Sequence, residues 1–416
     1  MKFEIRFVPA IAPFLVISAA AFLLAADSYS ERPGSPTPKP GGLTVHEWGT
    51  FTSVAGEDGS AIDWDALGGK DDLPGFVNDS GNRCTKWRLT GTVRMETPVL
   101  YFYSPRELDA HVKVLFPQGL ITEWYPQAEY EVYQKSRSDG SVSRLAPNLN
   151  GIDTSLRSLT GGIEWKNIKI QPGTAPALPT ESAPSRYYAA RGTDATPITV
   201  GGQHEKFLFY RGVGRFPVPL SARVSSDGKI VVENRGHDPV PGVILFENRG
   251  GRLGYRNAGA LTDVVTLERP SLDGSFPQLE YDLENALVAQ GLFFKEAQAM
   301  VETWRDSWFE EGSRLIYLVP SSAIDAMLPL EVDPAPSQTA RVFVGRIELI
   351  TPETRRSVEE ALARKDWATI DRYNRFLDPI LKRMGSENPS MASQIERFHI
   401  EQAARIQGSV SAGRCR

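Results

Sequence analysis

Five ionisable side chains carry the chemistry that this chain could perform: His46, Glu47, Glu96, Glu123 and His204. Imidazole and carboxylate groups together bind a metal ion or move a proton near neutral pH. All five lie in the β-rich part of the sequence, so separate strands could bring several of them together. The five histidines of the chain are scattered, however, and none has the spacing of a known ligand set. A structural or surface role is therefore the simpler interpretation of each.

Established catalytic motifs are absent from the sequence. His46-Glu47 begins like the zinc-binding helix motif, but Thr50 stands where that motif needs its second histidine. We find no phosphate-binding loop, complete dinucleotide fingerprint or nucleophile elbow around a serine. Asp58, Asp63 and Asp65 offer oxygen ligands for calcium, but their spacing does not match a calcium-binding loop, which favours a solvated acidic loop. The sequence thus assigns no cofactor and no metal ligand.

An apolar run from Phe7 to Ala26 follows Lys2 and Arg6 at the start of the chain. A basic start, an apolar centre and small residues at the end are typical of a secretory signal peptide. The run is also long enough for an uncleaved membrane anchor, and both interpretations remain open for residues 1–26. Residues 27–42 are rich in proline and glycine and predict an extended linker. Either way we expect an exported protein, periplasmic or extracellular, with the anchor alternative attaching it to the inner membrane through residues 7–26.

Composition and cysteine content limit the classes of partner. The chain has 416 residues, a formal net charge of -5 and 41% hydrophobic residues, which is ordinary for a globular protein. The mildly acidic balance disfavours a nucleic-acid partner. Cys84 and Cys415 are the two cysteines. In an oxidising compartment they could form a disulfide, but two separate thiols are the alternative, because a disulfide needs Cα atoms within about 7 Å.

The hydrophobic period changes near residue 275 and predicts an α+β fold. Before that point, alternating patterns predict a β-rich, sandwich-like domain over residues 43–275. Its strands are expected at 43–56, 92–103, 111–116, 121–125, 207–211, 220–224 and 230–234. An α+β domain is expected over 276–384, followed by a helical tail over 385–416. In this second part strands are expected at 314–319 and 341–350, and helices at 283–290, 295–309, 321–327, 352–365, 367–384 and 390–407.

Three segments resemble an uncharacterised family of exported proteins from environmental bacteria. They are Val45–Gly56, Arg94–Tyr103 and Thr303–Phe309. The resemblance covers most of the chain after the signal. It implies export and a shared architecture. Because that family has no assigned activity, the resemblance transfers no catalytic residue.

These observations favour a binding or interaction protein of the cell envelope. Export, turn-rich strands, an expectation of many exposed aromatic side chains and the lack of catalytic motifs support this hypothesis. An envelope polymer, such as a polysaccharide, or a partner protein would fit as its ligand. The alternative is an extracytoplasmic hydrolase, with or without a metal, that uses His46 or Glu47 together with Glu96, Glu123 or His204.

Overall fold

The computed structural model describes residues 36–39, 41–67, 73–80, 90–136, 139–145 and 156–409. The predicted signal or anchor, most of the predicted linker, and both Cys84 and Cys415 lie outside these residues. Within the described residues, no helix is both apolar enough and long enough to cross a bilayer.

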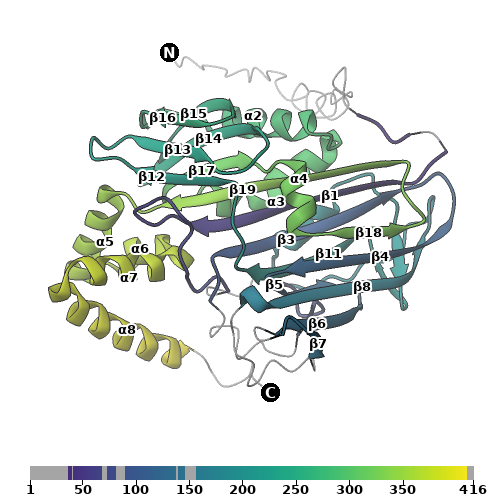
Figure 1. Ribbon diagram of the computed structural model, residues 1–416, viewed down its shortest axis with the longest axis horizontal. Helices are drawn as coiled ribbons and strands as arrows, with labels where there is room; N and C mark the ends of the chain where they lie inside the picture. The colour runs from purple at the N-terminus through teal and green to yellow at the C-terminus, as the bar shows by residue number, and fades with distance from the viewer. Residues whose placement is uncertain are drawn as a thin grey trace, which may run out of the picture. The chain divides into compact units, whose positions relative to one another are not determined.

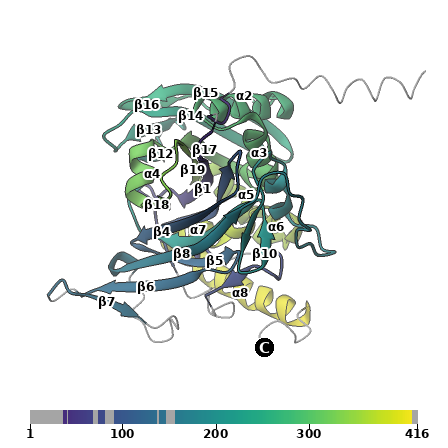
Figure 2. The same ribbon diagram turned by 90° about the vertical axis from the view of Figure 1, so that its right-hand side faces the viewer.

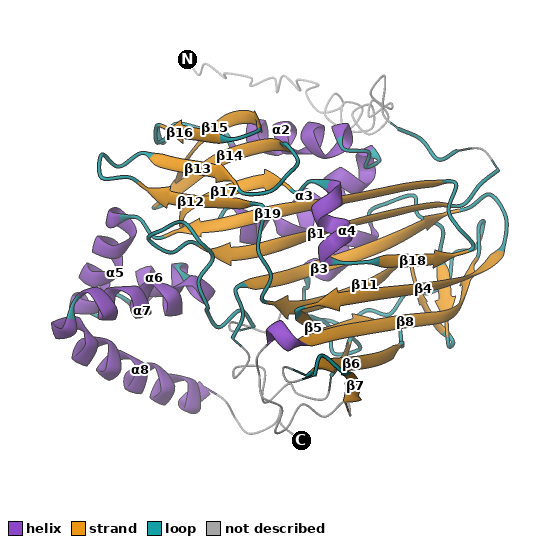
Figure 3. Ribbon diagram, viewed as in Figure 1, coloured by secondary structure: helices purple, strands orange, loops and turns teal. Residues whose placement is uncertain are grey.

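A mixed β-sheet forms the body of the described chain (Figures 1 and 3). Strand β1 (Thr44–Val54) lies inside it, antiparallel to β3 (Val93–Tyr103) and parallel to β19 (Gln338–Leu349). The strand order along the sheet is β10-β9-β8-β5-β11-β3-β1-β19-β17-β14-β15. The remaining strands of this path are β5 (Gly119–Tyr125), β8 (Leu159–Ile170), β9 (Ile198–Val200), β10 (Gln203–Glu205), β11 (Phe207–Gly214), β14 (Val240–Arg249), β15 (Arg252–Leu261) and β17 (Gly312–Leu318).

Every residue of β1 is buried, although about half of them are polar. Successive side chains of a strand point to opposite faces of the sheet. Val45 therefore joins one hydrophobic core, while Trp48 joins another on the opposite face. A bulge between Trp48 and Thr50 then shifts the register with β3. Because both faces of β1 are covered, its polar side chains must find partners inside the protein.

A second β layer covers one face of the central strands. The core on that face combines Val45 of β1 and Phe343 of β19 with Val112 of β4, Leu220 of β12 and Ile230 of β13. This arrangement is the sandwich-like packing that the sequence predicts. The strands outside the main path are β2 (Asn78–Asp79), β4 (Leu108–Pro117), β6 (Glu129–Lys135), β7 (Val142–Leu145), β12 (Leu220–Val224), β13 (Ile230–Asn234), β16 (Val264–Leu267) and β18 (Leu330–Asp333), with helix α4 (Ser321–Met327) beside them. Figure 2 shows the β6–β7 hairpin extending from the sheet.

Helices α2 (Phe276–Ala289) and α3 (Phe294–Trp308) pack on the other face. The apolar stripe predicted for α3 is buried in that core together with Leu279, Leu283 and Leu287 of α2. Helix α2 starts seven residues before its predicted start, at Phe276, because Ser275 is its N-cap and Pro277 occupies the first turn. The 3-10 segment η3 (Arg186–Arg191) ends a long loop after β8 and adds Tyr187 to the same core.

The chain ends in helices that form a third core with the end of β1. They are α5 (Pro352–Arg364), α6 (Trp367–Arg372), α7 (Leu377–Glu387) and α8 (Pro389–Ser409), with the 3-10 turn η4 (Asn374–Phe376) between α6 and α7. Thr351 caps α5 as predicted, since its side chain accepts a hydrogen bond from Thr354 N at 3.2 Å. The prediction of one helix over 367–384 is wrong, because Pro379 has no amide hydrogen and belongs in the first turn of a new helix.

The predicted α+β class is therefore confirmed, with a large mixed sheet followed by helices toward the C-terminus. The predicted boundary near residue 275 marks the change from strands to helices along the chain, but the sheet itself continues across it through β17 and β19. The expectation of many exposed aromatic side chains is wrong. Among the strongly exposed large apolar residues of the described chain, Tyr281 is the single aromatic one.

Candidate functional site

His46 and Glu47 lie on opposite faces of β1 and do not share a site. His46 faces helix α3, where its Nδ1 lies 2.8 Å from Glu296 Oε2. Both side chains have 0% exposure. Glu296 also accepts hydrogen bonds from Tyr103 Oη at 2.8 Å and from Phe293 N at 2.7 Å. The carboxylate thus fixes the imidazole ring, but no path from solvent leads to the pair.

Glu47 forms a buried ion pair on the opposite face. Its register partner on β19 is Arg341, and Arg341 Nε donates to Glu47 Oε2 at 2.7 Å. Tyr210 donates a second hydrogen bond to Glu47 Oε1. Burial raises the pKa of Tyr210, and the charge of Glu47 raises it further. Burial is the largest influence on the pKa of Arg341 and lowers it. The charge of Glu47, the neighbouring Tyr210 and the hydrogen bonds to Glu47 and Asp325 together outweigh burial, so the net shift of this pKa is upward. Glu47 is therefore held between two fixed donors, Arg341 Nε and Tyr210 Oη.

The other three predicted residues have separate partners. Glu123 accepts from Arg211 Nη2 at 2.8 Å. His204 Nδ1 lies 2.9 Å from Thr199 Oγ1. Glu96 accepts from Arg375 and lies 2.9 Å from Arg94 Nε. No hydrogen bond or ion pair within the described chain joins any two of the five candidates, so the structure does not assemble them into one site.

Metal binding finds no support in the described residues. No group of three or more His, Cys, Asp or Glu side chains in the described ranges is arranged to hold a metal ion. Asp63 instead pairs with Arg215 at 2.7 Å. Asp58 accepts the amide of Ser60 at 2.9 Å, and hydrogen bonds from Ser60 lower the pKa of this carboxyl. Asp58 is thus bound within its own loop, whereas Asp63 is bound by an arginine that follows β11.

A buried ionic network, which sequence analysis missed, joins the end of α3 to the sheet and the C-terminal helices. Arg314 on β17 pairs with Glu348 on β19 at 2.9 Å and donates to the carbonyls of Trp308 and Glu310 at 2.9 and 2.7 Å. It thereby satisfies carbonyls that the helix end leaves without partners. Arg346 continues the network by donating to Ser307 Oγ at 2.9 Å and pairing with Glu310.

The pKa shifts in this network follow from burial and neighbouring charge. Burial and the charges of Arg314 and Arg375 outweigh the attraction of Glu310 and lower the pKa of Arg346 to about 10. Burial raises the pKa of Glu348 despite the nearby Arg314. Charged residues inside otherwise apolar strands were the signal in the sequence that could have predicted this network. Such residues become buried with their strands, and fully buried charges are almost always paired. The network has the form of a structural support.

An open groove with a mostly apolar lining lies between α7 and α8. The two helices form a hairpin that turns at Asn388, whose amide donates to Met384 O at 3.0 Å. One side of the hairpin packs against α5 and α6 through Leu381, Ile395 and Phe398, and Phe398 stacks on Trp367 with ring centroids 5.4 Å apart. On another side the two helices line a shallow depression, open to solvent, of about 500 Å³.

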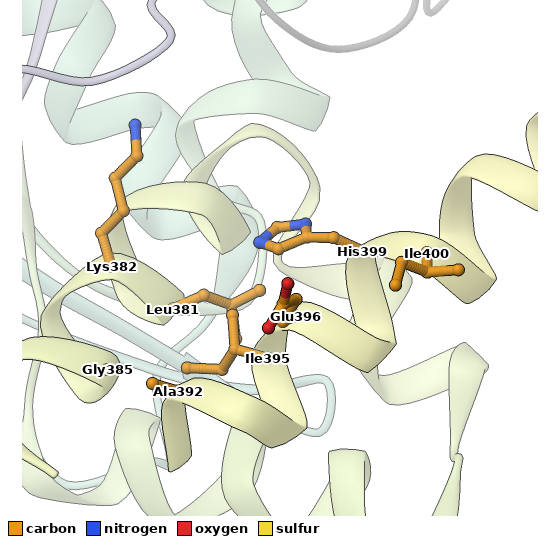
Figure 4. Close-up of a pocket in the computed structure, with 8 residues that line it drawn as sticks. All are labelled: Leu381, Lys382, Gly385, Ala392, Ile395, Glu396, His399 and Ile400. Atoms are coloured by element: carbon orange, nitrogen blue, oxygen red, sulfur yellow. The ribbon is translucent and has the colours of Figure 1, made fainter. Parts of the chain in front are cut away.

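The walls of this groove are mostly apolar (Figure 4). In that view Leu381 of α7 and Ile395 of α8 point toward each other, with Glu396 and His399 beside them on α8. Gly385 faces Ile395, because a Cβ atom at Gly385 would lie in ordinary contact, 3.4 Å from Ile395 Cδ1. Ile400 at the end of the groove is 64% exposed. The lining is formed by Leu381, Lys382, Gly385, Ala392, Ile395, Glu396, His399 and Ile400.

Comparisons with known proteins leave the function open. No family model matches the sequence, and no curated protein matches it. Among solved structures, the chain is similar to the yeast delta-COP-I mu-homology domain complexed with a Dsl1 WxWxV peptide. The TM-score is 0.23 at 9% sequence identity, over 75% of this chain and 98% of that chain. A likeness at this level supports no inference about activity or partners.

Proposed function

We propose that the chain is an exported interaction protein of the cell envelope that binds a protein partner through the α7–α8 groove. The observation that carries the proposal is the apolar lining of this groove together with the 64% exposure of Ile400. A helical groove lined with aliphatic side chains fits an amphipathic helix, which inserts anchors at helical spacing.

The placement of the ionisable residues supports this proposal over a hydrolase. Glu47, Glu96 and Glu123 each bind an arginine. A general base must come within hydrogen-bond reach of the proton that it removes. His46 and Glu296 have the orientation of such a base and its carboxylate, but their 0% exposure keeps substrate away.

The paucity of exposed aromatic side chains shifts the proposed ligand from a polysaccharide toward a protein. A flat sugar ring is bound best by an exposed Tyr or Trp side chain, which offers an apolar ring and a polar group together. Here the large rings of Trp48, Trp64, Trp165 and Trp308 are fully buried. We therefore expect protein contacts, and no turnover of ester or glycoside substrates that depends on His46.

Site-specific photo-crosslinking in the envelope tests this proposal. A photoreactive side chain replaces Ile400, and in a matched control it replaces Val142 on β7, which is 65% exposed. We expect a discrete protein adduct from position 400 and none from position 142. Equal labelling at both positions, or no adduct at position 400, would contradict the proposal. Hydrolytic turnover that disappears in a stably folded His46→Gln variant would favour the hydrolase.

A further inference from the structure

Helix α8 is long enough to pack against a neighbouring molecule as well as against α7. Helix α8 has 21 residues and α7 has 11. At 1.5 Å per residue, α8 is about 15 Å longer than its hairpin partner. Figure 3 shows α8 as a long helix at the lower left, below α7. Ile400 lies in the C-terminal half of α8 and is 64% exposed.

The face that α8 presents to the groove has the spacing of a helical ligand. Ala392, Glu396, His399 and Ile400 line the groove and are separated by four, three and one residues. Residues at this spacing share one face of a helix. Helix α8 therefore forms one wall of the groove and also presents the kind of helical face that binds in such a groove.

The charges at the groove are complementary between its two helices. Lys382 lies on the α7 side and Glu396 on the α8 side. Glu396 is exposed and makes no ion pair within the described chain. Lys382 pairs with Asp378 at 2.7 Å on its own helix and keeps donors for a further acceptor. In a two-fold pairing, Glu396 of each copy would face Lys382 of the other.

We infer that the occupant of the α7–α8 groove is α8 of a second copy of this chain, so that two hairpins pack as a symmetric pair. Ala392 is exposed at the groove, and its small side chain leaves room for the incoming helix. Ile400 of each copy then becomes buried against the hairpin of the other. This inference rests on the proposed function, because it names the partner of the same groove.

Sedimentation velocity of the purified exported chain over a range of concentrations tests the pairing. We expect a dimer that dissociates on dilution. Ile400→Glu should weaken the dimer at least tenfold, and Val142→Glu, a change at an equally exposed site on β7, should leave it unaltered. A chain that stays monomeric, or equal effects of the two variants, would overturn the inference.

A charge exchange then separates contacts between copies from contacts within one chain. Lys382→Glu and Glu396→Lys should each weaken the homodimer, because like charges meet at both symmetric positions. An equimolar mixture of the two variants should recover association as a heterodimer, since both of its contacts again join opposite charges. Failure of the mixture to recover would overturn the inference, because only pairing within one chain gives that result.

The two proposals fail in different ways. A wild-type chain that remains monomeric while position 400 crosslinks to a different protein would overturn the second copy as occupant and leave the interaction function standing. A monomer without any adduct at position 400 would overturn both. A crosslinked product between two copies, lost when the chain with the photoreactive side chain at position 400 also carries Lys382→Glu, would support both.

Discussion

Replacing Glu47 by glutamine tests whether this carboxylate has a structural or a catalytic role. Glu47 has 0% exposure and holds Arg341, whose side chain is 8% exposed, through a 2.7 Å hydrogen bond. Glutamine keeps the shape but removes the charge and one of the two acceptor oxygens. Arg341 keeps Asp325, which is 66% exposed, and the carbonyl of Leu328.

The size of the effect follows from these contacts. Removing one partner of a buried ion pair costs about 3–5 kcal/mol. Because Arg341 retains two other acceptors, we expect Glu47→Gln to lower the free energy of unfolding by about 2–4 kcal/mol. Glu331→Gln is the matched control, since Glu331 is exposed on β18 and makes no ion pair in the described chain. Its effect should stay within about 0.5 kcal/mol.

Urea unfolding followed by tryptophan fluorescence measures both variants. The transition midpoint of Glu47→Gln should fall with an unchanged dependence on urea, which identifies a loss of stability rather than a change in the unfolded state. Two results would refute the reasoning. One is a stability equal to that of Glu331→Gln. The other is the loss of an enzymatic activity in a variant as stable as the wild type.

Two further predictions concern packing and pH. Gly345→Ala should lower the free energy of unfolding by about 1–3 kcal/mol, because a Cβ atom there would lie 2.0 Å from Tyr317 Cζ. Gly242→Ala is its control in urea unfolding, with an ordinary 3.5 Å contact, and equal effects would contradict the prediction. Burial raises the pKa of the phenols well above their usual value in Tyr101, Tyr187 and Tyr210. Because the pKa of each phenol is higher in the folded than in the unfolded chain, its contribution to stability is fully present below pH about 10. That contribution declines as the pH rises further. In an alkaline titration, the absorbance at 295 nm should therefore show these phenols ionising only when the circular dichroism signal of the folded chain is lost. Ionisation of the three phenols while that signal is still intact would contradict the prediction.

Local signals in the sequence predicted most of the elements. Thr351 and Pro352 predicted the start of α5, and the stretch 321–327 matches α4. The stripe of apolar residues predicted α3 and its buried face. These features depend on caps and on hydrophobic period, which act over a few residues. The break before α7 follows equally from Pro379 once its missing amide is considered.

The partners of the polar residues could not be predicted in the same way. Glu47 meets Arg341 only because β1 pairs in parallel with β19, 294 residues away in the chain. His46 meets Glu296 across a separation of 250 residues. Glu296 carried one local signal, its place three residues after the N-cap Phe293 of α3. That signal predicts a helix start and says nothing of a histidine on another element.

Hydrogen–deuterium exchange tests the central claim, that the α7–α8 groove is the contact surface, most directly. Exchange is compared between the wild-type chain and Ile400→Glu under conditions in which the wild type associates. Amides of residues 381–400 should exchange more slowly in the associated wild type, while those of β7 (Val142–Leu145) should exchange alike in both. Slowed exchange confined to other elements, with no difference over residues 381–400, would contradict the account.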